Sequence, residues 1–254
     1  MQLHAGRSAL LLPLSRALSG ESRLIIAIDT PHLAEGRALA LAVRDAAGML
    51  KIGLELFIES GAEAIAIGHA CDRPVFLDLK LHDIPETVER SVARVSALGV
   101  KLVTVHACGG RAMLTRAVER AAKEGGSLQI VAVTVLTSMD DADLRSVGVA
   151  RAAAEQALVL AHLAFDCGVR AFVCSPHEAR LLRSELGPSA MLITPGVRPA
   201  GADAGDQKRV ATPRQAIVDG ADAVVVGRPI RDAADPLAAA WAIARELEDA
   251  RRSR

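Results

Sequence analysis

The sequence predicts a (β/α)8 barrel, the TIM-barrel architecture of the α/β class, from three observations. Short apolar segments alternate with longer amphipathic ones along the whole chain, in the order expected of repeated βα units. There are eight such apolar segments, and a chain of 254 residues suits one barrel of about 250 residues. Glycine and arginine follow the last two segments, where barrels often bind phosphate. An open doubly wound sheet is the alternative fold.

The expected strands are short apolar runs, a composition that suits parallel strands buried under helices. In chain order they are Leu24–Ile28, Leu50–Ile52, Val75–Leu79, Leu102–Val105, Gln129–Val135, Ala171–Cys174, Met191–Thr194 and Ala223–Val226.

The expected helices are the longer segments between these strands. Glu55–Gly68 is short but is included, and the alanine-rich Pro236–Glu248 closes the ring. The others are Pro31–Ala47, Pro85–Leu98, Arg111–Glu124, Ala152–Asp166, Pro176–Leu186 and Pro213–Gly220.

The composition favours a small ligand over a macromolecular partner. Hydrophobic residues make up 51% of the chain but aromatic residues only 2%, so Ala, Val, Leu and Ile must build the core. Thirty basic and thirty acidic side chains cancel, which removes the main electrostatic reason to expect nucleic acid or a membrane surface as partner.

The chain also carries signs of a cytoplasmic protein with one catalytic domain. Its four cysteines form no C-x-x-C pair, so we expect buried thiols in a reducing compartment rather than a zinc site or disulfides. Residues 1–22 are expected to be a poorly ordered extension and residues 23–254 the barrel. No apolar run approaches the roughly 18 residues that would span a bilayer.

Charged residues follow the first three strands. Asp29 follows the first, Lys51 lies in the second, and Asp78 and Lys80 end the third. Because active sites of barrels lie at the carboxyl ends of the strands, we expect these four side chains at one rim. Side chains alternate along a strand, so Asp78 and Lys80 should point to the same side.

The sequence allows two interpretations of the role of Asp83. In Asp83-Ile-Pro-Glu86 it could be the N-cap of a helix, and the residues by themselves favour that role. Alternatively it could extend an alternating Lys51–Asp78–Lys80–Asp83 array, in which opposite charges keep the lysines protonated. A charged lysine is a poor base but a good acid, so the array suits a reaction that develops and then protonates a carbanion.

A second cluster follows the last two strands, in Thr194-Pro-Gly196-Val-Arg198-Pro and in Val226-Gly227-Arg228-Pro. Glycine lets the backbone approach phosphate oxygens closely, and arginine adds charge-assisted hydrogen bonds. The cluster therefore predicts a phosphate site.

With these residues in hand, the chain resembles the orotidine 5′-phosphate decarboxylase family of bacterial type, over about residues 23 to 245. The most specific motif is Phe76-Leu-Asp78-Leu-Lys80-Leu-His-Asp83-Ile-Pro-Glu-Thr87-Val, which holds the family's D-x-K-x-x-D core. The family's other motifs follow in order: Val105-His-Ala-Cys-Gly-Gly110, Val133-Thr-Val-Leu-Thr137-Ser, Thr194-Pro-Gly-Val-Arg198-Pro, Gly205-Asp-Gln207-Lys-Arg-Val and Gly220-Ala-Asp-Ala-Val-Val-Val-Gly227-Arg228-Pro. The departures are the N-terminal extension, Glu86 where the family often has Asn, and Cys108.

The resemblance implies cofactor-independent decarboxylation of orotidine 5′-phosphate to UMP in a homodimer. It implies that Lys80 protonates C6 of the pyrimidine beside Asp78, and that Lys51 and Asp29 approach the ribose. It further implies that Asp83, Ile84 and Thr87 reach the neighbouring subunit's site. The remaining implied substrate contacts are Thr137, Pro195, Arg198, Gln207, Gly227 and Arg228.

Two other functions remain possible from the sequence. D-x-K-x-x-D also occurs in magnesium-dependent sugar-phosphate decarboxylases and synthases, although the Gln207 loop and the T-P-G-V-R-P stretch speak against these. A catalytically silent nucleotide-binding regulator is the other. His82 and His106 lack partners at metal-ligand spacing, so we expect packing histidines and no catalytic metal.

Overall fold

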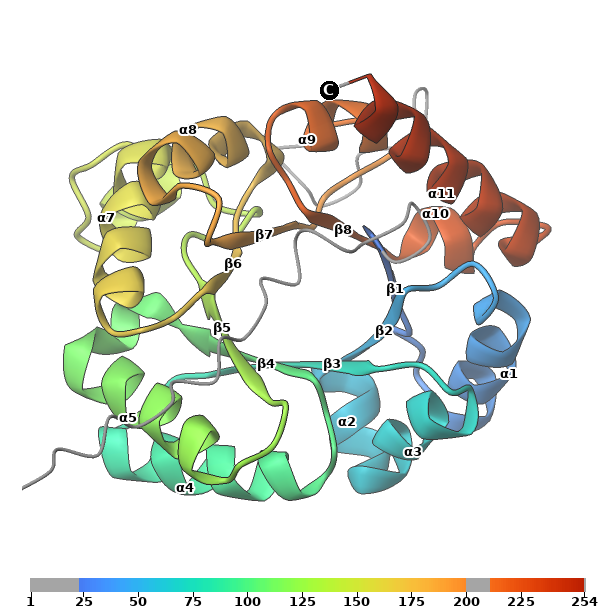
Figure 1. Ribbon diagram of the computed structural model, residues 1–254, viewed down its shortest axis with the longest axis horizontal. Coiled ribbons are helices and arrows are strands. Elements are labelled where there is room, and N and C mark those ends of the chain that lie inside the picture. The colour runs from blue at the N-terminus through green and yellow to red at the C-terminus, as the bar shows by residue number, and fades with distance from the viewer. Residues whose placement is uncertain (1–22, 200–210, 254) are drawn as a thin grey trace, which may run out of the picture.

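The computed structural model describes residues 23–199 and 211–253, and its strands form a closed barrel. Eight parallel strands follow one another in chain order, and β1 pairs with both β2 and β8. Figure 1, seen along the barrel, shows the ring of strands with helices around it. The barrel prediction is therefore confirmed, and the open sheet is excluded. The expected extension 1–22 lies outside the described residues.

All eight strands lie within two residues of their predicted bounds. They are β1 (Leu24–Ala27), β2 (Met49–Gly53), β3 (Val75–Leu81), β4 (Leu102–His106), β5 (Gln129–Val133), β6 (Ala171–Val173), β7 (Met191–Thr194) and β8 (Ala223–Val226).

The helices that cover the barrel were also anticipated in outline. They are α1 (Leu33–Val43), α2 (Leu54–Ser60), α3 (Ala62–Ala70), α4 (Pro85–Ala97), α5 (Gly110–Lys123) with the 3-10 turn η3 (Ala107–Gly109) before it, α7 (Ala153–Asp166), α8 (Pro176–Leu186), α9 (Pro213–Val218) and α11 (Pro236–Arg252).

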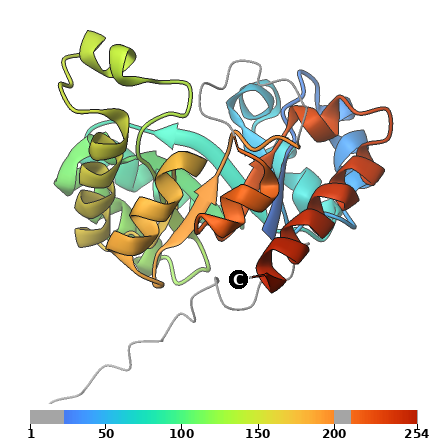
Figure 2. The ribbon, with the colours of Figure 1, turned by 90° about the horizontal axis from the view of Figure 1, so that it is seen from above.

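The structure departs from the predicted helices in three places. The single helix expected over 55–68 is two helices, because Gly61 adopts a φ of 55° between α2 and α3. Two short helices were not predicted: α6 (Asp141–Ser146), closed by an Asp140–Asp143 capping box, and α10 (Arg228–Arg231). Figure 2 shows α6, in yellow-green, projecting from one end of the barrel.

Asp83 is not the N-cap of α4, which corrects the reading that the residues by themselves favoured. The helix begins at Pro85 with Ile84 as N-cap and has no side-chain cap. The Asp83 carboxylate instead accepts a hydrogen bond of 2.6 Å from the Ile84 amide. Asp83 stands one residue too early to reach the free amides of the first turn.

Two apolar clusters build the core. One fills the space between strands and helices, and the other fills the barrel interior with Ile25, Ala27, Met49, Phe76, Leu102, Val131, Ala171, Met191, Ile193, Ala223 and Val225. Interior residues alternate with outward ones along each strand, so the next inward positions above Ala27, Met49 and Phe76 are Asp29, Lys51 and Asp78. The packed interior thus ends in a charged layer.

Two smaller observations complete the fold. Cys71, Cys167 and Cys174 are buried thiols as expected, but Cys108 is exposed, which corrects that prediction for one of the four.

Among the helices of residues 23–199 and 211–253, none is both long and apolar enough to cross a membrane.

Candidate active site

A cleft of about 420 Å³ opens at the carboxyl ends of the strands. Ala27, Val133, Val173 and Val225, which continue the interior stack, form part of its lining. The polar lining comes from six segments: Asp29, Lys51, Asp78, Lys80, Thr137, Ser138, Pro195, Gly196, Arg198, Gly227, Arg228 and Arg231. The structure therefore brings together the two clusters that the sequence placed at strands one to three and at strands seven and eight.

Four charged side chains in the cleft form a chain of alternating sign. The Lys51 ammonium lies 3.0 Å from Asp29 Oδ1 and 3.7 Å from Asp78 Oδ2. The Lys80 ammonium donates to the same Asp78 oxygen at 2.9 Å. The order is Asp29–Lys51–Asp78–Lys80, so Asp29 rather than Asp83 completes the array within one chain.

Asp78 is the centre of this chain, and its side chain is only 15% exposed. Burial by itself raises the pKa of the Asp78 carboxyl, but the charges of Lys51 and Lys80 and hydrogen bonds from Lys80 and Thr104 outweigh it. The net effect is a pKa below the ordinary value, so Asp78 stays ionised. An ionised carboxylate at this depth is stable because two ammonium groups compensate it.

Lys80 reaches the site by an irregular backbone. The β3–β4 register shifts between Leu77 and Leu81, so Asp78, Leu79 and Lys80 face the single residue Thr104. Lys80 itself has a φ of 51°, a left-handed conformation that β-carbon-bearing residues seldom adopt. Asp78 and Lys80 do reach the same side, as predicted, but through a bulge rather than through regular alternation.

The Thr194–Arg198 segment and α10 line the same cleft. Gly196 adopts a φ of 74°, which turns the chain after β7, and the buried Arg198 pairs its backbone with Ala211. The short helix α10 starts at Arg228, directly after Gly227 and β8. A short extra helix after strand eight is a recurrent part of phosphate sites in barrels.

Sequence reasoning missed two residues that hold this site together. Arg231 lines the cleft and donates to the Asp29 carbonyl at 2.8 Å, which ties α10 to the end of β1. Thr104 bonds both Asp78 and Lys80. Arg231 lies in a helix that was not predicted. Thr104 occupies an inward position of β4, which a period-two count from Leu102 could have flagged.

Some predicted site residues do not line the cleft of this chain. Asp83, Ile84 and Thr87 are exposed and lie outside its lining. Ile84 is 66% exposed, which is high for an isoleucine. Gln207 lies outside the described residues.

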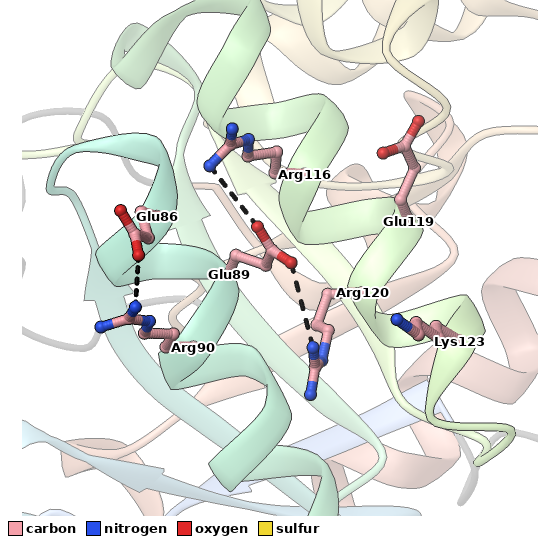
Figure 3. A pocket seen from close by; sticks show the side chains of 7 residues that line it. All are labelled: Glu86, Glu89, Arg90, Arg116, Glu119, Arg120 and Lys123. Atoms are coloured by element: carbon pink, nitrogen blue, oxygen red, sulfur yellow. Dashed lines mark ion pairs between the residues drawn. The ribbon is translucent and has the colours of Figure 1, made fainter.

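A second and larger hollow, of about 680 Å³, lies between α4 and α5. Its acidic and basic side chains pair with one another: Glu86 with Arg90, and Glu89 with Arg116 and Arg120. Figure 3 shows these pairs on the outer faces of the two helices. Exposed ion pairs of this kind contribute little free energy and offer no buried reactive group, so the smaller cleft is the candidate active site.

The two histidines near Lys80 differ in exposure. His82 is exposed, which corrects its expected packing role, whereas His106 is half-buried with its ring centroid 5.5 Å from that of His82. Burial, together with the charges of His82 and Lys80, lowers the pKa of His106 below 6.5. Within the described residues, no group of three or more His, Cys, Asp or Glu side chains is arranged to hold a metal ion.

Fold and site together define a class: barrel enzymes that bind a phosphorylated ligand over a lysine–aspartate charge network. Comparisons with known proteins narrow this class. The model of the orotidine 5′-phosphate decarboxylase / HUMPS family matches residues 22–243. This chain belongs to that family.

Individual relatives agree with this assignment. The orotidine 5′-phosphate decarboxylase of Anaeromyxobacter sp. (strain K) is 50% identical over 225 residues, which cover 89% of this chain and 98% of that protein. The Rhodospirillum rubrum protein of the same name is 46% identical over 233 residues, covering 89% and 94%. The crystal structure of orotidine 5′-phosphate decarboxylase from Lactobacillus acidophilus has a TM-score of 0.77 at 34% identity, covering 88% of this chain and 98% of that one.

The lowered pKa of His106 predicts its behaviour in a pH titration. Protonation of a half-buried histidine beside Lys80 is unfavourable, so the neutral form is kept to lower pH than for an ordinary histidine. We expect the ring signals of His106 in NMR spectra to titrate at a lower pH in the folded protein than in the urea-unfolded protein, which serves as control. A midpoint that is equal or higher in the folded protein would contradict the effect of burial.

Proposed function

We propose that this protein decarboxylates orotidine 5′-phosphate to UMP, the last step of de novo pyrimidine synthesis, and that it needs no cofactor. One observation carries the proposal: the Asp29–Lys51–Asp78–Lys80 chain lines a single cleft together with glycines and arginines that suit a phosphate. Family membership and the names of the relatives support the same activity.

The chemistry explains why such a site is needed. The bond between C6 and the carboxylate breaks, CO₂ leaves, and the electron pair stays on C6. That lone pair lies in the plane of the pyrimidine ring and cannot delocalise into the π system. Catalysis therefore depends on fixed charge at the place where the anion develops, a contribution worth about 3–4 kcal/mol for a single well-placed donor.

Lys80 is the proton donor in this proposal. Its ammonium lies in the cleft 2.9 Å from Asp78, and its side chain is 31% exposed. In the proposed reaction this ammonium gives its proton to C6. Asp78 lies beside the departing carboxylate. The site stabilises the transition state because the positive charge of Lys80 lies next to the carbanion as it forms.

The remaining contacts hold the nucleotide. Lys51 and Asp29, joined at 3.0 Å, are proposed to bind the ribose hydroxyls. Thr137 and Pro195 also line the cleft, and we assign them to contacts with the nucleotide. Arg198, Gly227 and Arg228 are proposed to bind the phosphate together with Gln207. Phosphate binding then aligns the pyrimidine, so its loss should lower turnover as well as affinity.

We further propose that the site is completed by a second subunit. Asp83, Ile84 and Thr87 lie at the start of α4, exposed and outside the cleft of their own chain. The side chain of Ile84 is 66% exposed and is therefore accessible to a second subunit. In a two-fold dimer the same segment of each subunit could approach the partner's Lys80.

The first prediction concerns Lys80. Lys80→Ala should lose UMP formation by more than about 100-fold, the lower end of the share that a general acid contributes. The decrease in absorbance on conversion of orotidine 5′-phosphate measures it, and Lys123→Ala, an exposed lysine on α5, is the control. Nucleotide binding should persist in Lys80→Ala, and activity above a hundredth of wild type would refute the donor role.

The second prediction distinguishes the proposed cofactor-independent decarboxylase from the magnesium-dependent alternative. Asp29 and Asp78, the acids of the cleft, both pair with lysines. We therefore expect full activity after dialysis against EDTA. Inhibition that magnesium reverses would instead favour a sugar-phosphate decarboxylase or synthase. A protein that binds UMP but never turns over the substrate would be the silent regulator.

The third prediction tests the shared site. Asp83→Ala and Lys80→Ala should each be inactive as pure dimers. Random exchange between them restores one intact site in each mixed dimer, so an equal mixture should regain about a quarter of wild-type activity under two-fold symmetry. Activity of the mixture equal to that of the separate variants would rule out a site built from both subunits.

A further inference from the structure

Because of the bulge in β3, the Lys80 amide does not take a regular position in the hydrogen-bond ladder between β3 and β4. Leu77 pairs with Val103 and Leu81 with Val105, so three residues of β3 stand against Thr104 alone. Lys80 lies in this bulge with its φ of 51°. A residue held in such a conformation requires support from its surroundings.

Thr104 provides that support through its side chain. Its hydroxyl accepts a hydrogen bond of 2.8 Å from the Lys80 amide and donates one of 2.9 Å to Asp78 Oδ1. The direction is unambiguous, because an amide can only donate and a carboxylate can only accept. The Thr104 side chain is fully buried, and its β-branch restricts its rotamer.

These two bonds fix both partners of the ion pair at once. Asp78 Oδ1 is held by Thr104, which leaves Oδ2 to face Lys80 at 2.9 Å and Lys51 at 3.7 Å. The backbone that carries the Lys80 side chain is held by the same hydroxyl. Thr104 does not line the cleft, so it cannot contact a ligand there.

We propose that Thr104 is a positioning residue, whose hydroxyl holds the Lys80 backbone and the Asp78 carboxylate in the geometry that proton transfer to the substrate requires. This inference rests on the proposed function, because it concerns the same reaction. It adds a residue that acts through Asp78 and Lys80 rather than on the nucleotide.

The test compares three variants on orotidine 5′-phosphate. Thr104→Val keeps the shape and loses the hydroxyl, and should lower kcat about 10- to 100-fold with little change in KM, as expected when reacting groups are misplaced by a fraction of an ångström. Thr104→Ser keeps the hydroxyl and should stay within about threefold of wild type. Thr134→Val is the matched control, because Thr134 is a buried threonine of the adjacent β5–β6 region that bonds the Val173 carbonyl instead.

A pH profile adds a readout that a purely structural role would not move. The Thr104 hydrogen bond helps to lower the pKa of Asp78, so its loss should shift the acidic limb of kcat to higher pH. The groups that face Asp78 are Lys51, Lys80 and Thr104, with His106 beside them. Thr134→Val should keep the wild-type limb.

The outcomes are distinct. Equal kcat in Thr104→Val and Thr134→Val, or equal losses in Thr104→Val and Thr104→Ser, would overturn the positioning role. If Thr104→Val does not fold, as judged by circular dichroism, Thr104→Ala replaces it with the same expectation. A wild-type protein that is inactive on orotidine 5′-phosphate would refute the proposed function instead, before any variant is compared.

Discussion

The ionised Asp78 carboxylate, compensated from both sides by Lys51 and Lys80, is the interaction on which the site depends. A carboxylate that is 15% exposed above an apolar interior would be costly if it stood alone. Both ammonium groups lie within 4 Å of one of its oxygens, and Thr104 bonds the other. Because each charge stabilises the next, the four residues from Asp29 to Lys80 form a unit rather than four independent groups.

The barrel is what makes this unit possible. Its interior is filled by apolar side chains from all eight strands. The charged side chains therefore lie at the carboxyl ends of the strands and not inside the barrel. The same end gathers the segments that follow β7 and β8, with Arg231 linking α10 to the end of β1. The proposed phosphate site and the proposed proton donor are thereby held in one cleft by the ring of strands.

The β3 bulge gives the site its specific geometry. In a regular strand, the backbone at Lys80 would stay extended and in register with β4. Here the register shifts against Thr104 and Lys80 adopts a left-handed φ, so the backbone changes direction at this residue. Strained backbone is tolerated where surrounding contacts over-determine it. The hydroxyl of Thr104 and the pairing of Lys80 with Asp78 are such contacts.

The sequence by itself determined the strands, the barrel, the family and most residues of the cleft, because each depends on local patterns: apolar runs, strand ends and compact motifs such as Asp78-Leu-Lys80. It could not reveal the direct 3.0 Å ion pair between Asp29 and Lys51 within one chain, since β1 and β2 meet only in the folded sheet. The roles of Thr104 and Arg231 were likewise decided by tertiary structure. The hydrogen bond between Thr104 and Asp78 joins residues 26 positions apart, and the one between Arg231 and Asp29 joins residues 202 positions apart. Both bonds depend on strand register and barrel closure, which no short segment of sequence determines.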